Sequence, residues 1–358
     1  MKRIHVFALV LVLIVPTVVF AQGSDNVTGK FGVAHAPEVT GIEVYTNEAC
    51  TEVATSLTPQ QEYFIKIDVS DEDGIDTVLN LEVRLWYDVD GAITDTIMSD
   101  SSQIPYPDKG FVFLCYSQTG AIFIPFNKGS WDVGEAIIEQ HTDTTASYTI
   151  PVTIGKLAME TTTDDDAWMI GVYAKDELHT PDDPFQGEAY YEKNGTAGLP
   201  MNWYGEIVVE ENTAVDWGNI PGGTKYSDDE ARQELNQGIS YLSNGTYGEQ
   251  AKAAKEWDLI VGEGQASRVA MDPTVANNFS LKVGKTQDHS AAETLDSSED
   301  AFVSIQTGNE RAVFVGTTAE GEEVANPADY NLFIELATEF TVGTYSGSIT
   351  FGIFNDHE

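Results

Sequence analysis

Residues 63–70 read Tyr-Phe-Ile-Lys-Ile-Asp-Val-Ser, and residues 79–89 read Leu-Asn-Leu-Glu-Val-Arg-Leu-Trp-Tyr-Asp-Val. In both stretches apolar side chains alternate with mostly polar ones, which is the period of a β-strand with one buried face. Similar short stretches recur from Gly41 to Glu210, separated by turn sequences such as Asp73-Gly74 and Asp90-Gly91. Seven or more such strands predict a β-sandwich, with an aromatic-rich insertion before residue 147 that serves either as core or as a binding platform.

The pattern returns in the C-terminal part of the chain. The sequence Pro221-Gly222-Gly223 interrupts it, and the clearest strand of the chain spans residues 345–353. One segment favours a helix, because Ser227-Asp228-Asp229-Glu230 has a capping-box pattern, for which we expect one or two turns. The sequence therefore predicts an all-β protein of two tandem β-sandwich domains with at most short helical turns, the first at residues 37–212 and the second at 213–358.

The N-terminus has the features of a secretory signal. Lys2-Arg3 precedes an apolar run from Ile4 to Val15, and the small residues Val19 and Ala21 fit cleavage before Gln22. The alternative, an uncleaved anchor, is opposed by the run being shorter than the ~20 residues that a bilayer needs. We therefore expect a signal peptide at residues 1–21, a flexible lead at 22–36, and a secreted, cell-surface-associated protein.

The charge balance limits the classes of partner that the protein is expected to bind. The chain has 58 Asp and Glu against 18 Lys and Arg, a formal net charge of −40. Such a surface repels nucleic-acid phosphates and anionic lipids, so neither is an expected partner. Neither a His-Glu-x-x-His nor a Gly-x-Ser-x-Gly sequence occurs. The sequence therefore favours a non-catalytic protein, and a glycoside hydrolase, which needs only two carboxylates, is kept as the alternative.

Several residues carry specific expectations. In an exported protein Cys50 and Cys115 are predicted to form a disulfide, the alternative being two buried free thiols. Trp86 falls on the polar face of its strand, which makes it the best candidate for an exposed, ligand-binding ring. Asn-x-Ser/Thr sequences, which are weak signals for glycosylation, occur at four positions: Asn26, Asn194, Asn244 and Asn278.

Several short motifs resemble a known class of proteins. Tyr45–Cys50, Ile67–Ile75 and Gly155–Ala158 are similar to immunoglobulin-like modules of secreted archaeal surface proteins, methanogen-type chains in particular, and Ser243–Tyr247 and Gly343–Gly347 are similar to their C-terminal sandwich domains. The resemblance implies immunoglobulin-like sandwiches and a cell-surface or envelope-associated protein, but no reaction. The chain departs from true immunoglobulin spacing, since Trp86 lies too far after Cys50 and Phe113 replaces the expected tyrosine.

Acidic clusters follow two of the predicted strands, those at residues 63–70 and 167–175. In an immunoglobulin-like order these strands run in the same direction, so their ends meet at one end of the sandwich. Closely spaced carboxylates near a Gly turn suit calcium, which takes six to eight oxygen ligands. The alternative is that they are solvated acidic loops. The predicted calcium ligands are Asp71, Asp73, Asp76, Asp176, Glu177 and Asp182.

Together these features predict an exported, non-catalytic cell-surface or extracellular-matrix protein that binds envelope proteins or glycans. The alternative is a carbohydrate-binding module or glycoside hydrolase that uses loop carboxylates and exposed aromatic rings.

Overall fold

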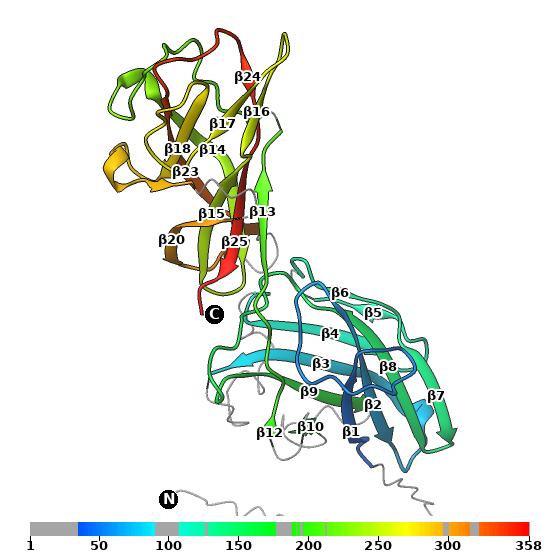
Figure 1. The fold of residues 1–358 in the computed structure, drawn as a ribbon. Helices are drawn as coiled ribbons and strands as arrows, with labels where there is room; N and C mark the ends of the chain where they lie inside the picture. The colour runs from blue at the N-terminus through cyan, green and yellow to red at the C-terminus, as the bar shows by residue number, and fades with distance from the viewer. Residues whose placement is uncertain are drawn as a thin grey trace, which may run out of the picture. The chain divides into compact units, whose positions relative to one another are not determined.

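The computed structural model describes residues 35–89, 107–125, 128–176, 188–190, 192–193, 196–211, 213–295, 301–315 and 322–357. Within these residues the chain forms β-strands and short 3-10 helices, so the predicted all-β class is confirmed (Figure 1). The predicted signal segment at 1–21 and most of the lead at 22–36 lie outside the described residues.

The N-terminal part of the described chain forms two antiparallel sheets that share one hydrophobic core, here called the N-terminal sheet pair (Figure 1). One sheet contains β1 (Glu38–Tyr45), β2 (Glu62–Ser70), β6 (Asp132–Val133), β7 (Ile137–Thr142) and β8 (Thr145–Thr153). The other contains β3 (Val78–Asp88), β4 (Gly110–Tyr116), β5 (Ile122–Phe123), β9 (Ala167–Asp176) and β10 (Glu188–Tyr190). A short hairpin joins β11 (Glu192–Lys193) to β12 (Thr196–Ala197).

The alternating stretches become strands with one core-facing side. In β2 every second residue from Tyr63 to Val69 is buried, as the period of two predicts. In β3 the pairing with β9 shifts between Val78 and Asn80, so Val78 is buried and Leu79 is 40% exposed. The bulge thus reverses the predicted facing of Leu79, and from Leu81 to Trp86 both faces of the strand are buried.

The best-packed rings of the aromatic-rich insertion belong to the hydrophobic core and do not form a surface platform. Trp131 is buried, and its ring stacks on that of Phe111 with 4.8 Å between centroids. Trp168 of β9 packs against the same indole at 5.6 Å. These large rings fill the space between the two sheets.

A second pair of sheets forms from the C-terminal part of the chain, here called the C-terminal sheet pair. The larger sheet contains β13 (Gly205–Val209), β14 (Arg232–Ser243), β16 (Glu256–Leu259), β17 (Gln265–Arg268), β18 (Asn278–Gly284), β19 (Glu293–Thr294), β23 (Asn326–Leu336) and β24 (Tyr345–Ser346). The smaller contains β15 (Tyr247–Ala253), β20 (Val303–Asn309) and β25 (Ile349–Asn355). A separate hairpin joins β21 (Val313–Val315) to β22 (Glu322–Val324). β13 precedes residue 212 and pairs with β14, so the larger sheet begins at Gly205.

The helix-favouring segment forms only one helical turn. The 3-10 helices of the described chain are η1 (Ile75–Thr77), η3 (Asp229–Ala231) and η4 (His289–Ala291). The side chain of Asp228 makes no capping hydrogen bond at η3, and Arg232 already begins β14. Pairing of β14 with β23 and burial of Leu235 outweigh local helix propensity there.

Candidate functional site

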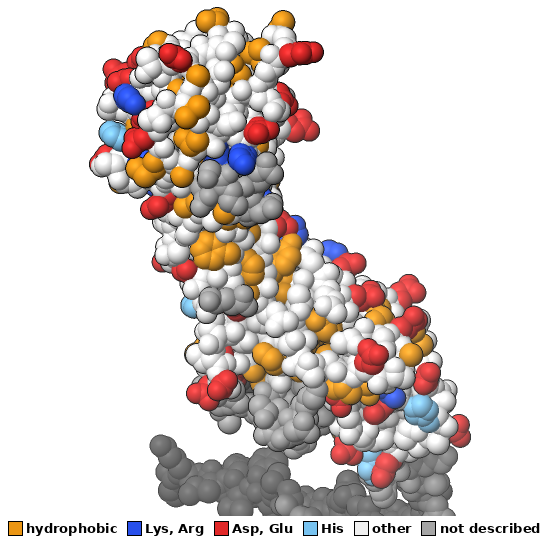
Figure 2. Space-filling view, in the orientation of Figure 1, with side chains coloured by type: hydrophobic (Ala, Val, Ile, Leu, Met, Phe, Trp, Pro, Cys, Tyr) orange, Lys and Arg blue, Asp and Glu red, His pale blue; other side chains and the backbone are white. Residues whose placement is uncertain are grey.

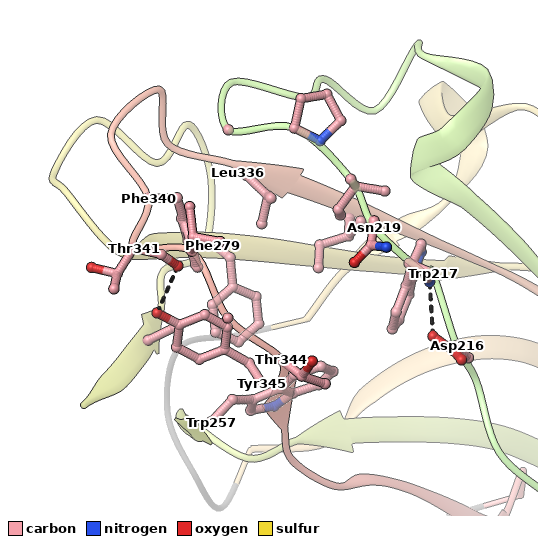
Figure 3. Close-up of a pocket in the computed structure, with 18 of the residues that line it drawn as sticks. Asp216, Trp217, Asn219, Trp257, Phe279, Leu336, Phe340, Thr341, Thr344 and Tyr345 are labelled. Atoms are coloured by element: carbon pink, nitrogen blue, oxygen red, sulfur yellow. Dashed lines mark hydrogen bonds between the residues drawn. The ribbon is translucent and has the colours of Figure 1, made fainter. Parts of the chain in front are cut away.

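A pocket of about 550 Å³ lies in the C-terminal sheet pair (Figure 3). In the figure Trp217 and Asn219 lie on one side of the pocket, and Phe279, Phe340 and Tyr345 lie on the other. The volume falls within the range of roughly 300 to 1,000 Å³ that is typical of small-molecule sites. Five aromatic residues line the pocket: Trp217, Trp257, Phe279, Phe340 and Tyr345.

One wall is the segment between β13 and β14. Trp217 is half-buried, and its Nε1 donates to the carbonyl oxygen of Ala231 at 2.9 Å. The Gly223 amide donates to the Ala337 carbonyl at 2.9 Å, which ties this segment to the end of β23. A Cβ on Gly222 would lie 2.8 Å from the Thr338 carbonyl oxygen, so the close approach of the two chains requires glycine.

The other wall is the loop between β23 and β24. The Thr341 amide donates to Asn277 Oδ1 at 2.6 Å, and the Asn277 amide donates to the Glu339 carbonyl at 2.9 Å. The Ile260 amide donates to the Thr344 carbonyl at 2.8 Å. Hydrogen bonds thus hold both walls in place.

The rings pack against one another at the base of the pocket. Trp257 lies 6.2 Å from Trp217 and 5.1 Å from Phe279, measured between ring centroids. Phe340 and Tyr345 meet edge to face at 5.2 Å. The Tyr345 hydroxyl donates to the Thr341 carbonyl at 3.1 Å. These contacts fix the orientation of the rings, which offer apolar surface to a ligand.

Beside the rings, the polar side chains of Asp216, Asn219, Thr341 and Thr344 line the pocket. Asp216 and Asn219 are exposed, and Asp216 Oδ1 accepts from the Gly218 amide at 2.7 Å. Of the described residues that line the pocket, none is Lys, Arg or His, and Asp216 is the only carboxylate. Figure 2 shows acidic side chains spread over the face that it draws, with few basic ones among them. The electrostatic surroundings of the pocket therefore disfavour anionic ligands.

The predicted calcium ligands come together only in part. Asp176 pairs with Val78 at the start of β3, so β9 ends beside the loop that follows β2, as strand direction predicts. Asp71 is buried, and its carboxylate accepts from the Asp73 amide and from Thr77 Oγ1, both at 2.9 Å. Asp73 in turn accepts from the His35 amide at 2.5 Å.

These contacts direct the carboxylate of Asp71 into its own loop and the carboxylate of Asp73 toward His35. Within the described part of the chain no group of three or more His, Cys, Asp or Glu side chains is placed to hold a metal ion. Glu177 and Asp182 lie outside the described residues. The calcium site therefore stays a prediction.

The predicted disulfide is not formed, because the structure holds Cys50 and Cys115 as free thiols. Cys50 Sγ lies 3.8 Å from Thr149 Oγ1, on the outer side of β8. Cys115 faces the core from β4, in the opposite sheet. Burial raises the pKa of the Cys115 thiol to about 12, as expected for a sulfur shut away from water.

Trp86 is fully buried, so the expected exposed ring is wrong. It shares the outer face of β3 with Glu82 and Arg84, which are also buried. Arg84 Nη2 donates to Glu82 Oε1 at 2.6 Å, and Lys175 Nζ donates to Glu82 Oε2 at 2.8 Å. Burial alone would raise the pKa of Glu82, but the hydrogen bond from Lys175 and the charge of Arg84 outweigh it, and the pKa is lowered.

The four sequons differ in accessibility. Asn26 and Asn194 lie outside the described residues, and Asn278 is half-buried at the start of β18. Asn244 is completely buried, and its side chain donates to the carbonyls of Ala158 and Asn202. An amide committed in this way has no room for a glycan, so the prediction at Asn244 is wrong.

The aromatic pocket could not be predicted from the sequence. Trp217 stands four residues before the Pro221-Gly222-Gly223 interruption, and Tyr345 begins the last alternating stretch. In the sequence Trp217 belongs to the domain boundary and Tyr345 belongs to a strand, and neither feature indicates a pocket. Nothing in the local pattern indicates that the segment before β14 and the loop after β23 meet, because only the pairing of β14 with β23 brings them together.

Comparison with known proteins gives no relative. No known protein family matches the chain, and no curated protein is significantly similar to it. Of the described residues, none form a helix with the length and apolar character needed to span a membrane.

Proposed function

We propose that the protein is an exported, non-catalytic binding protein of the cell surface or extracellular matrix, and that it takes its ligand in the aromatic pocket of the C-terminal sheet pair. The signal-like N-terminus and the acidic composition support the location. We further propose that the two sheet pairs are tandem immunoglobulin-like β-sandwich domains, in keeping with the separate cores of each pair.

The observation that carries the proposal is the composition of the pocket. Five aromatic rings surround a space of about 550 Å³ whose walls are held by backbone hydrogen bonds. A concave site that combines aromatic side chains with a small number of polar side chains is the usual form of a ligand site. A purely structural protein gains nothing from such an opening in its core.

The alternative, a glycoside hydrolase, needs two carboxylates about 5 to 10 Å apart on either side of the scissile bond. Asp216 is the only carboxylate among the described residues that line the pocket. The arrangement therefore favours binding over cleavage, and it keeps a carbohydrate-binding role within the proposal.

The test is retention of the purified mature protein by cell-envelope material from the source organism, measured in a sedimentation assay. We expect saturable retention by wild type and about tenfold weaker retention by Trp217→Ala, because that variant removes one side of the pocket. Trp131→Phe, a change in the core of the N-terminal sheet pair, is the matched control and should bind as wild type does. Equal retention of all three proteins would refute the role of the pocket.

A further inference from the structure

We propose that the aromatic pocket binds a neutral sugar unit, with the pyranose ring lying against the aromatic faces and its hydroxyls bonded to Asn219. This inference rests on the proposed function and names the ligand class for the same site. Three properties of the pocket support it: its charge, the orientation of its rings, and the amide of Asn219 at its edge.

The charge of the pocket selects against acidic ligands. A phosphate, a sulfate or an acidic sugar needs a basic side chain or a cluster of amide donors to replace its hydration. No Lys, Arg or His occurs among the described lining residues, and Asp216 adds a negative charge to a chain of net charge −40. A ligand without negative charge is therefore required.

The rings offer their faces rather than their polar atoms. Trp217 Nε1 is bonded to the Ala231 carbonyl, and the Tyr345 hydroxyl is bonded to the Thr341 carbonyl. Trp257 is nine-tenths buried, and a Cβ on Gly347 would meet its indole at 2.1 Å, so this edge of the ring is packed against the backbone. The ligand consequently meets flat carbon surface, which complements the C–H face of a pyranose ring.

Asn219 supplies the polar complement. It is exposed, lines the pocket, and makes no hydrogen bond with the described residues. Its amide offers a donor and an acceptor side by side, and neighbouring sugar hydroxyls offer the same pair in return. A quaternary ammonium group, which aromatic pockets also bind, would leave that amide unused. A volume of about 550 Å³ is also large for such a small cation.

The pocket is open to the end of a longer glycan. Val342 on its rim is 97% exposed, and Thr341, Gly343 and Thr344 beside it are exposed as well. A terminal sugar can therefore enter while the rest of its chain stays in solvent.

The experiment compares chemically treated envelope material in the sedimentation assay. One portion is treated with periodate, which cleaves vicinal diols in sugars, and then quenched. A second portion is digested with protease, and a third is left untreated. The variant is Asn219→Ala, which removes an exposed side chain that has no hydrogen-bond partner among the described residues, and the matched control is Asn236→Ala, an exposed asparagine of β14 that does not line the pocket.

We expect periodate to abolish retention of wild type and protease to leave it unchanged. Asn219→Ala should bind untreated material about five- to tenfold more weakly than wild type, the effect of losing one or two hydrogen bonds, and Asn236→Ala should bind normally. Choline chloride at a concentration matched to a sodium chloride control should not compete.

Three outcomes would overturn the inference while leaving the proposed function in place. Retention that survives periodate but is lost after protease would assign the pocket to a protein partner. Competition by choline would assign it to a cation. Loss of retention after periodate with undiminished binding of Asn219→Ala would show that Asn219 does not bind the sugar. Absence of retention of wild type by untreated material would instead overturn the proposed function itself.

Discussion

The indole nitrogen of Trp217 donates a hydrogen bond to the carbonyl oxygen of Ala231, with 2.9 Å between the two atoms. Ala231 is completely buried at the end of η3, so the bond anchors the Trp217 ring to the fixed start of β14. The ring is thereby held in place as a wall of the pocket.

Trp217→Phe should lower the free energy of unfolding by about 1 to 2 kcal/mol, because a half-buried ring loses its hydrogen bond and leaves the Ala231 carbonyl without that donor. Urea unfolding followed by circular dichroism measures the change. Val342→Ser, at a fully exposed position, is the control and should stay within about 0.5 kcal/mol of wild type. A Trp217→Phe protein as stable as wild type would show that the bond is not maintained in solution.

Gly347→Ala should disrupt the base of the pocket. An added Cβ would lie 2.1 Å from Cδ1 of Trp257, so either the ring or the strand must shift. We expect a loss of about 1 to 3 kcal/mol in the free energy of unfolding and a changed near-ultraviolet circular dichroism signal of tryptophan. Ser346→Ala, at the exposed neighbouring residue, should change neither quantity. Normal stability of Gly347→Ala would contradict the close packing of Trp257 on this strand.

Stability should depend on the ionisation of Glu82. Its pKa is lowered from the ordinary value of 4.5, so the folded state favours the carboxylate. The stabilisation is fully present above about pH 5 and is lost as the pH falls through the lowered pKa. Glu82→Gln should therefore cost about 3 kcal/mol near neutral pH, since it leaves the buried Arg84 without its carboxylate.

The difference between wild type and Glu82→Gln should shrink as the pH is lowered from about 6 to 3, measured by urea unfolding at each pH. Asp132→Asn, which breaks the exposed pair with Lys128, is the control and should cost less than about 1 kcal/mol. A difference that is constant with pH would mean that Glu82 does not titrate with folding.

The two cysteines should react separately. Iodoacetamide should modify the partly exposed Cys50 in the native protein, whereas Cys115, buried and with a pKa of about 12, should react only after unfolding. Mass spectrometry of the unreduced, unfolded protein should count two modified thiols. A disulfide-linked peptide that contains both residues would contradict the free thiols of the structure.

The calcium prediction needs variants that spare the fold. Asp71→Ala should destabilise the loop by about 1 to 3 kcal/mol whether or not calcium is present, because the Asp73 amide loses its acceptor and the Thr77 hydroxyl keeps only the Gly74 carbonyl. The informative protein is therefore Asp73→Asn, Asp76→Asn. If the site exists, calcium should raise the melting temperature of wild type more than magnesium does at equal ionic strength, and the double variant should lose the difference. Equal shifts of the melting temperature with calcium and magnesium would support the alternative, that the clusters are solvated acidic loops.

The strands themselves could be predicted from local pattern. The alternation from Tyr63 to Val69 reappears as buried and partly exposed positions of β2, because a pleated strand beside a core has only one dry face. The local pattern failed where pairing intervened. Leu79 turns outward at a bulge, and the helix-favouring residues after Ala231 join β14, because long-range hydrogen bonds and burial outweigh propensity.

Single side chains were harder to place. Trp86 stands on the face of β3 that polar residues mark as solvent-facing, yet that face is buried and carries the ion pairs of Glu82. Cys50 and Cys115 suit a disulfide by their number and by the predicted export, but their sulfurs lie on different sides of one sheet. The alternation of residues shows which side chains share a face of a strand. It does not show which other segments cover the polar face.

The sequence by itself determined the all-β class and the strands, since these follow from the period of apolar residues along one segment. Only the tertiary structure decided the pocket. Trp217, Trp257 and Tyr345 come from segments far apart in the chain, and they meet because the pairing of β16 with β24 and of β14 with β23 sets their positions. Local pattern encodes the faces of strands, whereas a binding site depends on contacts between strands whose register the whole sheet fixes.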